Sequence, residues 1–320
     1  MPRDNVSRLT RVVRAYTGES HQRLRERIEG TPRGQSLIPA ARSALQRRLE
    51  RRAFFTLAWP DELTIYPFGV KSVIPAPDSI TLNFEGDHVA DHAVQLLPWT
   101  RDTEIGGVPG LRVCRTSASG IDLVVAGTSA TINVTGISRH AWEQAESARI
   151  SWLADAGEEM CHITSPHLQT AQERLFERYL ATDDHSAWLS SGLLRRIGLF
   201  SRIEVPLHFS AWRNPGQHGE QWCFDMDYHP LNGGCQHEAF LSRLTDPMFG
   251  LPLTVVRRHC TGDYSWGAQC SIDAKGMGQP GEVNLRFNRR TAERTMAWQD
   301  MSPAVMAAKQ LVWHTPSLLR

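Results

Sequence analysis

The heptapeptides GVPGLRV, residues 107–113, and GLPLTVV, residues 250–256, occupy the same place in two similar runs of sequence. Each follows a segment typical of an apolar strand and then a helix, and each leads into further strand-like segments. Gly107 and Pro109 correspond to Gly250 and Pro252 at an offset of 143 residues. Little else is identical, so the match indicates a repeat of the pattern of elements.

Both copies are expected to be α/β sandwiches, because short runs rich in Val and Ile predict strands and longer amphipathic runs predict helices. In the first copy we expect strands at 62–68, 79–85, 110–116, 121–127 and 130–136, with helices at 88–99 and 138–160. In the second copy we expect strands at 203–212, 221–228, 251–259, 264–273 and 281–288, with helices at 236–248 and 290–299. A strand, a helix, two or three strands and a helix are what a split βαβ, or ferredoxin-like, sandwich produces.

The predicted fold class is therefore α+β, with an N-terminal helical segment followed by two ferredoxin-like (split βαβ) sandwich units. In the N-terminal segment, Gly18 is expected to end a first helix and Ser20 to cap a second. We expect four segments: an arginine-rich helical head at 1–55, a first α/β unit at 56–155, a helical connector at 156–200 and a second α/β unit at 201–320.

The head is strongly basic. Residues 1–52 contain 13 arginines and five acidic residues, a net charge of +8, so the remainder of the chain carries −7. Such a head presents a solvated helical face, docks on the acidic body of its own chain, or contacts phosphate or another acidic partner. Two short helices joined by a tight turn also permit a DNA-reading helix-turn-helix, although such a pair is more often a plain helical hairpin.

Several classes of protein are disfavoured by what the sequence lacks. No apolar run is long enough to span a bilayer, and the N-terminus has no apolar segment of a secretory signal, so we expect a cytoplasmic protein without membrane association. The six cysteines are scattered, which is typical of reduced thiols or metal ligands. The sequence contains no Walker loop, no H-E-x-x-H and no G-x-S-x-G, which argues against the common ATPases, zinc proteases and serine hydrolases.

The stretch WCFDMDYHPLNGGCQHE, residues 222–238, contains candidate site residues. If 222–228 is a strand, its aromatic residues point to one face and Cys223, Asp225 and Asp227 point to the other. The simplest interpretation is a core strand followed by a turn and a helix. Alternatively, Asp225 and Asp227 hold Mg²⁺ or Mn²⁺ at a nucleotidyl-transfer site.

The run Phe224-Asp225-Met226-Asp227 resembles the first acidic motif of archaeo-eukaryotic primase polymerases. The resemblance implies a palm-like βα unit with metal-dependent nucleotidyl-transfer activity. In that family a strand, a turn of small residues and then a histidine follow. Here His259 precedes the turn, in the run RRHCTGDYSWGAQCSIDAKG at residues 257–276. An acidic strand comes next in the family, and the resemblance implies Asp273 of this run as a third carboxylate.

A zinc site is a further interpretation of the same stretch. Cys223, His229, Cys235 and His237 are spaced as Cys-x5-His-x5-Cys-x-His, and these ligand types suit tetrahedral Zn²⁺. The spacing differs from the short Cys-x2–4-Cys clamp of familiar zinc modules. Zinc and the two-metal site compete for one face of the strand.

The leading prediction is a non-enzymatic cytoplasmic protein that binds nucleic acid or an acidic protein surface. The alternatives are a metal-dependent nucleotidyl-transfer or phosphoesterase enzyme that uses Asp225 and Asp227, and a zinc-stabilised interaction module. The candidate phosphate contacts are arginines of the head and of the last predicted strands: Arg8, Arg11, Arg14, Arg23, Arg25, Arg27, Arg47, Arg48, Arg51, Arg52, Arg257, Arg258 and Arg286.

Overall fold

The computed structural model describes residues 3–32, 34–58, 66–101, 104–181, 184–201, 208–216, 219–228, 237–261 and 269–289. The chain divides into two units, the first made of Met1–Leu57 and Gly69–Gly198, the second of Ala58–Phe68 and Leu199–Arg320. Each unit contains helices and a mainly antiparallel sheet, which confirms the α+β class. Within the described ranges, every helix is too short or too polar to cross a membrane.

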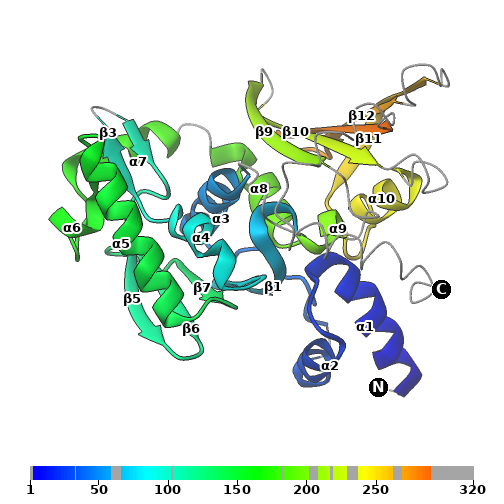
Figure 1. Ribbon diagram of the computed structural model, residues 1–320. Helices are drawn as coiled ribbons and strands as arrows, with labels where there is room; N and C mark the ends of the chain where they lie inside the picture. The colour runs from blue at the N-terminus through cyan, green and yellow to red at the C-terminus, as the bar shows by residue number, and fades with distance from the viewer. Residues whose placement is uncertain are drawn as a thin grey trace. The chain divides into compact units, whose positions relative to one another are not determined.

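The sheet of the first unit has the strand order β1-β2-β7-β6-β5. Its strands are β1 (Val70–Ala76), β2 (Ser79–Phe84), β5 (Leu111–Ser117), β6 (Gly120–Val125) and β7 (Thr131–Thr135). All neighbours are antiparallel except β2 and β7, which are parallel. The short helix α4 (Ala90–Val94) follows the first hairpin, and α5 (Arg139–Asp155) follows β7 and packs on α4 (Figure 1).

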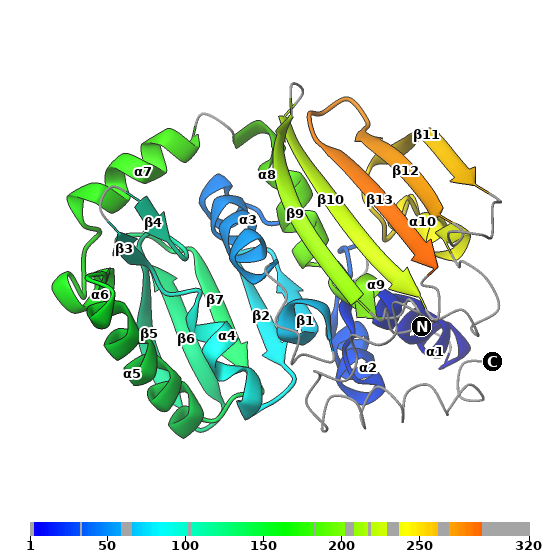
Figure 2. The same ribbon diagram turned by 45° about the horizontal axis from the view of Figure 1, so that its top comes forward.

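The sheet of the second unit repeats this topology, as the sequence pattern predicts. Its order is β11-β12-β13-β10-β9, and β10 and β13 are its parallel pair (Figure 2). The strands are β9 (His208–Gly216), β10 (Gly219–Tyr228), β11 (Leu253–Thr261), β12 (Gln269–Gly276) and β13 (Glu282–Arg289), with α10 (His237–Leu244) after β10. The expected helix at 290–299 lies outside the described residues.

The ferredoxin-like topology is not confirmed for either unit. Each sheet has five strands, because a complete hairpin precedes the helix. In the first unit, β2 precedes α4 and β5 follows it. These two strands are parallel, but β7 and β6 lie between them in the sheet. A split β-α-β connection is therefore present, within a larger sheet.

The two units agree in local detail as well. β5 has a bulge between Val113 and Arg115, and β11 has one between Val255 and Arg257. Each arginine then pairs across the hairpin with an aspartate at 2.7 Å, Arg115 with Asp122 and Arg257 with Asp273. Bulges bend a strand and are kept where the fold requires the bend, so the shared bulge is part of the repeated unit.

Alternation along the strands gives each sheet an apolar face and a polar face. In β10, Trp222, Phe224 and Met226 are fully buried, and Phe224 contacts Phe200 of α9 (Gly198–Ser201) at 4.9 Å between ring centroids. Phe240 of α10 extends this cluster to Phe287 of β13. The core interpretation of WCFDMDY is confirmed for Trp222, Phe224 and Met226.

Helices of the head complete the core of the first unit: α1 (Arg3–Thr17), α2 (His21–Gly30) and α3 (Ala44–Leu57). Gly18 has φ +74° and Ser20 accepts a hydrogen bond from the backbone N–H of Arg23, so both predicted caps are confirmed. Val13 and Leu24 are fully buried, so the head is part of a folded unit.

Several other elements of the first unit were not predicted from the sequence, or were predicted with different bounds. A small sheet joins β3 (Trp99–Arg101), β4 (Glu104–Gly106) and β8 (Glu159–Met160), and the predicted helix at 138–160 ends at Asp155. After it come α6 (Cys161–Thr164), α7 (Ala171–Ala181) and α8 (Ala187–Leu194). The strand expected at 62–68 is wrong where it is described: residues 67–69 form a 3-10 turn, and the first strand begins at Val70.

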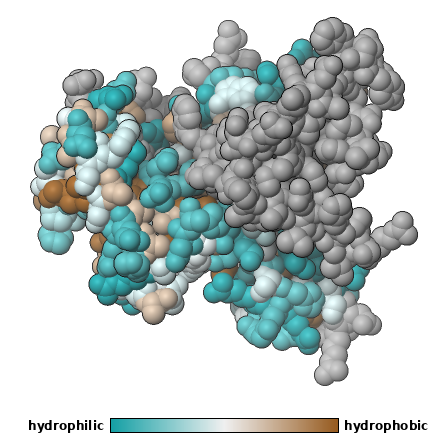
Figure 3. All heavy atoms as spheres, viewed as in Figure 1, coloured by the Kyte–Doolittle hydropathy of each residue, from teal (hydrophilic) through white to brown (hydrophobic). Residues whose placement is uncertain are grey.

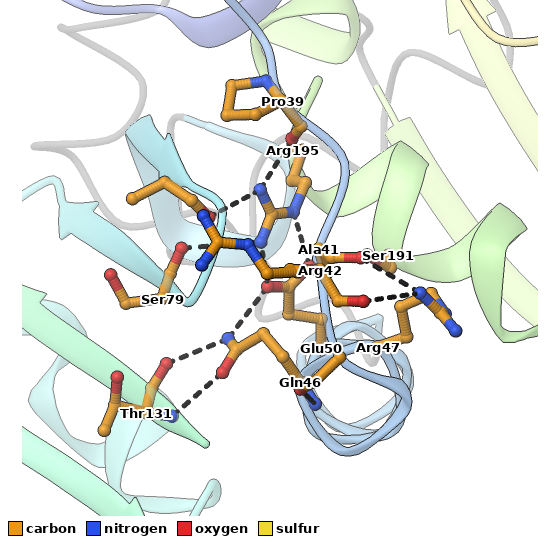
Figure 4. Close-up of polar contacts among 12 residues, drawn as sticks. Pro39, Ala41, Arg42, Gln46, Arg47, Glu50, Ser79, Thr131, Ser191 and Arg195 are labelled. Carbon is orange, nitrogen blue, oxygen red and sulfur yellow. Dashed lines mark hydrogen bonds and ion pairs between the residues drawn. The ribbon is translucent and has the colours of Figure 1, made fainter. Parts of the chain in front are cut away.

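A buried ion pair ties together distant parts of the first unit (Figure 4). The Arg195 Nε donates to Glu50 Oε2 at 2.7 Å, and Nη1 donates to the backbone oxygens of Pro39 and Ala76 at 2.6 and 2.9 Å. Gln46 bridges Glu50 to the backbone of Thr131 in β7. The exposed fractions of the Arg195 and Glu50 side chains are 1% and 0%. One of the five acidic residues of the head therefore neutralises a buried arginine that lies outside the head.

Candidate metal centre

Three metal-binding side chains converge beside the edge of the second sheet. The antiparallel register of β11 and β12 places Cys260 directly opposite Cys270. Paired residues of neighbouring strands point to the same face, here the face of Phe287, which pairs with Cys270. The His237 ring, at the first position of α10, lies over that face with its centroid 5.9 Å from the Phe287 ring.

The ligand atoms of His237, Cys260 and Cys270 all lie within 4.8 Å of one another. Tetrahedral zinc, with Zn–N and Zn–S bonds near 2.0 and 2.3 Å, separates such donors by about 3.5–3.8 Å. A closure of about 1 Å, within the reach of thiol rotation, would complete three corners of the tetrahedron. Neither cysteine forms a disulfide, and neither do the other described cysteines. One nitrogen and two sulfurs suit zinc better than magnesium, calcium or manganese.

The protonation of His237 also fits a ligand. Burial, and next the positive charge of Arg258, lower the pKa of His237, so the ring is neutral at neutral pH. Its Nδ1 is buried and has no hydrogen-bond partner within the described part of the chain. Its Nε2 lies 3.5 Å from Glu238 Oε1 and also contacts Arg258. Metal-binding histidines commonly donate their second ring N–H to a carboxylate, which is the position Glu238 occupies.

Arg258 supplies the remaining charge of the cluster. Hydrogen bonds to Cys260 and then to Glu238 raise the pKa of Arg258, so its guanidinium lies beside the sulfur and forms an ion pair with Glu238. Two thiolates would neutralise a divalent cation, and Arg258 and Glu238 neutralise each other. The cluster can therefore hold a divalent ion without unbalanced charge.

The zinc ligands expected from the sequence are only partly in place. Cys223 lies on the opposite, polar face of the sheet, paired with Trp212 and Asn284, so the structure does not bring it together with His237. Burial raises the pKa of the Cys223 thiol. His229 and Cys235 lie outside the described residues. Cys260 and Cys270 were missed, because the sequence placed Cys260 in the turn after the strand at 251–259 and Cys270 within the strand at 264–273.

Of the expected catalytic carboxylates, the structure describes the side chains of Asp225 and Asp273, which lie at separate positions of the sheet. Asp273 pairs with Asn284 and Asp225 with Arg286, so two strand spacings, about 10 Å, and two residues, about 7 Å, separate the aspartates. Two-metal sites instead hold their ions about 4 Å apart between shared carboxylates. The Asp227 side chain lies outside the described part. Nucleotidyl transfer stays a prediction that this arrangement does not favour.

The surroundings of Asp273 and Asp225 are those of sheet residues. Asp273 accepts from Asn284 and pairs with Arg257, and in the first unit Asp122 has the matching partners Arg115 and Asn133 in its register. The Nε of Arg286 lies 4.0 Å from Asp225 Oδ1, and its guanidinium lies over the Trp212 ring. The matching positions of the first unit hold Asn83 and Thr135, which form a hydrogen bond.

The predicted phosphate-contacting arginines divide into two groups. Most have partners within the chain: Arg25 with Glu29, Arg27 with Glu19, Arg47 with backbone oxygens at 41 and 42, Arg52 with backbone oxygens at 105 and 107, Arg257 with Asp273, Arg258 with Glu238 and Arg286 with Asn284. Arg51 is buried, and Arg48 lines a hollow described below.

The second group forms the exposed surface of the head. The side chains of Arg8, Arg11, Arg14 and Arg23 are exposed and form no hydrogen bond or ion pair with the described residues. Arg8, Arg11 and Arg14 are three residues apart, so they share one side of α1. Figure 3 shows a mostly hydrophilic surface over α1 and α2.

Comparison with known proteins adds no functional assignment. No family model matches the chain, and no curated protein or solved structure is significantly similar to it. The function must therefore be argued from the chemistry of the sites.

Proposed function

We propose that this protein is a zinc-stabilised module that binds one Zn²⁺ through His237, Cys260 and Cys270. The observation that carries the proposal is the convergence of one imidazole and two thiols within 4.8 Å. The three side chains come from a helix and two paired strands, so one ion would join three elements. The zinc-stabilised alternative from the sequence is thus retained with a different ligand set.

Hydrogen bonding around His237 supports metal binding through Nδ1. If Nε2 accepts from Arg258, the neutral ring carries its proton on the buried Nδ1, where no described group accepts it. If Nε2 instead donates to Glu238, the Nδ1 lone pair is buried and unused. A metal ion on Nδ1 resolves the second case, because it uses that lone pair while Glu238 orients the ring.

A structural role for the ion follows from where the ligands lie. α10 has eight residues, fewer than an isolated helix needs for stability in water. β11 is an edge strand on which Val255 and Val256 are 40% and 52% exposed, so it contributes little apolar burial there. An ion bound at both elements would add to the stability that the buried residues of α10 supply.

Metal analysis of the purified protein tests the proposal. We expect about one zinc per chain, lost in Cys260→Ser and Cys270→Ser and retained in Cys114→Ser, whose exposed thiol lies in the first unit. Cobalt substitution adds a second readout, because thiolate ligands give charge-transfer absorption. Less than about half an equivalent of zinc in wild type, or equal loss in Cys114→Ser, contradicts the proposal.

The same measurement identifies the fourth ligand. The sequence places Cys235, which lies outside the described residues, two positions before His237. If Cys235→Ser lowers zinc content as Cys270→Ser does, the site is closed by four protein ligands and is structural. If zinc content is unchanged, water holds the fourth position, as in sites with three protein ligands.

A second candidate function is binding of an acidic partner, nucleic acid or protein, by the head. The exposed side chains of Arg8, Arg11, Arg14 and Arg23 favour it. Deleting the head would remove buried core residues, so the test is the triple variant Arg8→Gln, Arg11→Gln, Arg14→Gln. For nucleic acid, loss of three phosphate contacts reduces the slope of log affinity against log salt by about 2–3. Wild-type protein that binds no oligonucleotide and no acidic peptide at low salt contradicts this function.

A further inference from the structure

A hollow of about 300 Å³ in the first unit is lined by three arginines and one glutamate: Arg48, Arg174, Glu177 and Arg178. Arg48 belongs to α3 and the other three belong to α7. Three guanidinium groups and one carboxylate therefore line the hollow. All three arginines are exposed, so the hollow is open to solvent.

Buried contacts fix the positions of α3 and α7, the two helices that form the hollow. The buried carboxylate of Glu173, on α7, binds Arg112 of β5 at 2.7 Å and also accepts from the backbone N–H groups of Gly110 and Thr170. Arg52 of α3 lies over the Phe176 ring of α7, 5.3 Å from its centroid. The walls of the hollow are therefore positioned by the fold before any ligand arrives.

Two of the arginines that line the hollow carry like charges at close spacing. Arg174 and Arg178 are four residues apart on α7, a spacing at which like charges repel. Burial raises the pKa of Glu177, whereas a hydrogen bond from Gln169 and then the positive charge of Arg48 lower it. An anion between Arg174 and Arg178 would reduce the repulsion between their guanidinium groups.

We propose that this hollow binds a small phosphate-bearing molecule. Arginine binds phosphate through a planar fork of N–H donors, and three such forks from two helices can surround one phosphate group. The volume lies at the lower end of the range for small-molecule sites, so the ligand is small. The aliphatic stems of the arginines provide apolar contact for the rest of the molecule. This site is independent of the proposed zinc centre, which lies in the other unit.

Calorimetric titration of the full chain tests the proposal, with inorganic phosphate and pyrophosphate as probes in low-salt buffer. We expect saturable binding of one equivalent, tighter for pyrophosphate. Arg174→Ala and Arg178→Ala each weaken binding roughly tenfold, because each removes a charge-assisted donor. Alanine favours the helix, so both variants keep α7 intact, which circular dichroism verifies.

Two further variants make the test specific. Arg139→Ala removes an exposed arginine of α5 that pairs with Glu143, and it should leave the affinity unchanged within about twofold. Glu177→Gln should tighten binding severalfold, because it removes the one negative charge at the hollow. The proposal is overturned if no saturable heat appears up to about 10 mM ligand. Equal loss in Arg139→Ala, or binding of an oligonucleotide alone, also overturns it.

Discussion

Replacing Glu50 with glutamine should expose how much the first unit depends on its buried ion pair. The Glu50 carboxylate accepts four hydrogen bonds, two from Arg195, one from Ser191 and one from Gln46. Each carboxylate oxygen accepts two of them. Glutamine keeps one acceptor oxygen and puts an NH₂ group where the other was, so two donors then face a donor.

The expected loss of stability follows from what stays buried. Arg195 stays charged and buried, with 1% of its side chain exposed, and it keeps its hydrogen bonds to the Pro39 and Ala76 oxygens. It loses its counter-ion. Removing one partner of a buried pair typically lowers the free energy of unfolding by about 3–5 kcal/mol. The retained carbonyl contacts place Glu50→Gln near the lower end, about 3 kcal/mol, which is roughly a 150-fold change in the folding equilibrium.

Native-state hydrogen exchange is the suitable assay, because peptides of the first unit can be followed separately from those of the second. The matched control is Glu29→Gln, which removes an exposed partner of Arg25 and should change stability by less than about 0.5 kcal/mol. The double variant Glu50→Leu, Arg195→Met, which leaves no unpaired charge, should be less destabilised than Glu50→Gln. A loss below about 1 kcal/mol in Glu50→Gln, or a double variant worse than the single one, would refute the reasoning.

Three further outcomes are expected. Although burial raises the pKa of Glu173, its hydrogen bond from Arg112 and those from the backbone outweigh this and lower it below 4.5. The stability that Glu173 adds is therefore present above pH 4.5 and lost as the pH falls through the lowered pKa, so urea midpoints of wild type and Glu173→Gln should converge only under acid conditions. Glu238→Ala should weaken zinc binding about tenfold, measured by competition with a chelating dye, and unchanged affinity would remove Glu238 from the site. Burial raises the pKa of Cys161 to about 12, so iodoacetamide at mildly alkaline pH should modify exposed Cys114 and leave Cys161 intact, as peptide mass spectrometry can show.

Strands with regular alternation could be predicted from the sequence, because burial on one face imposes a period of two. β2, β6, β7 and β10 follow this pattern, and each was expected within a few residues of its bounds. β1 was missed because Lys71 and Pro75 interrupt its apolar residues, and proline argues against a strand except at an edge, where β1 lies. The strands of the small sheet have two or three residues, too few for any period to appear.

The candidate metal centre could not be predicted, because its ligands depend on register. Cys260 meets Cys270 only because the bulge between Val255 and Arg257 shifts the pairing of β11 by one residue. A one-residue slip moves every following side chain to the other face, so sequence spacing alone does not show which cysteines share a face. Cys223 and His237 show the opposite case. Their sequence spacing suits a shared zinc site, but their side chains lie on opposite faces of the sheet.

Comparison of the two units indicates that the metal centre is an addition to the repeated fold. The hairpin of β5 and β6 ends with the pair Ser117 and Gly120, whereas the matching hairpin of β11 and β12 continues beyond the equivalent pair, His259 and Ser271. The first additional pair is Cys260 and Cys270. Longer strands at a sheet edge expose unpaired backbone groups and gain little apolar burial, so an extension of this kind needs another source of stability. The proposed zinc ion, bound to the extension and to α10, would provide it, and the cysteine pair is found in the longer hairpin without a counterpart in the shorter one.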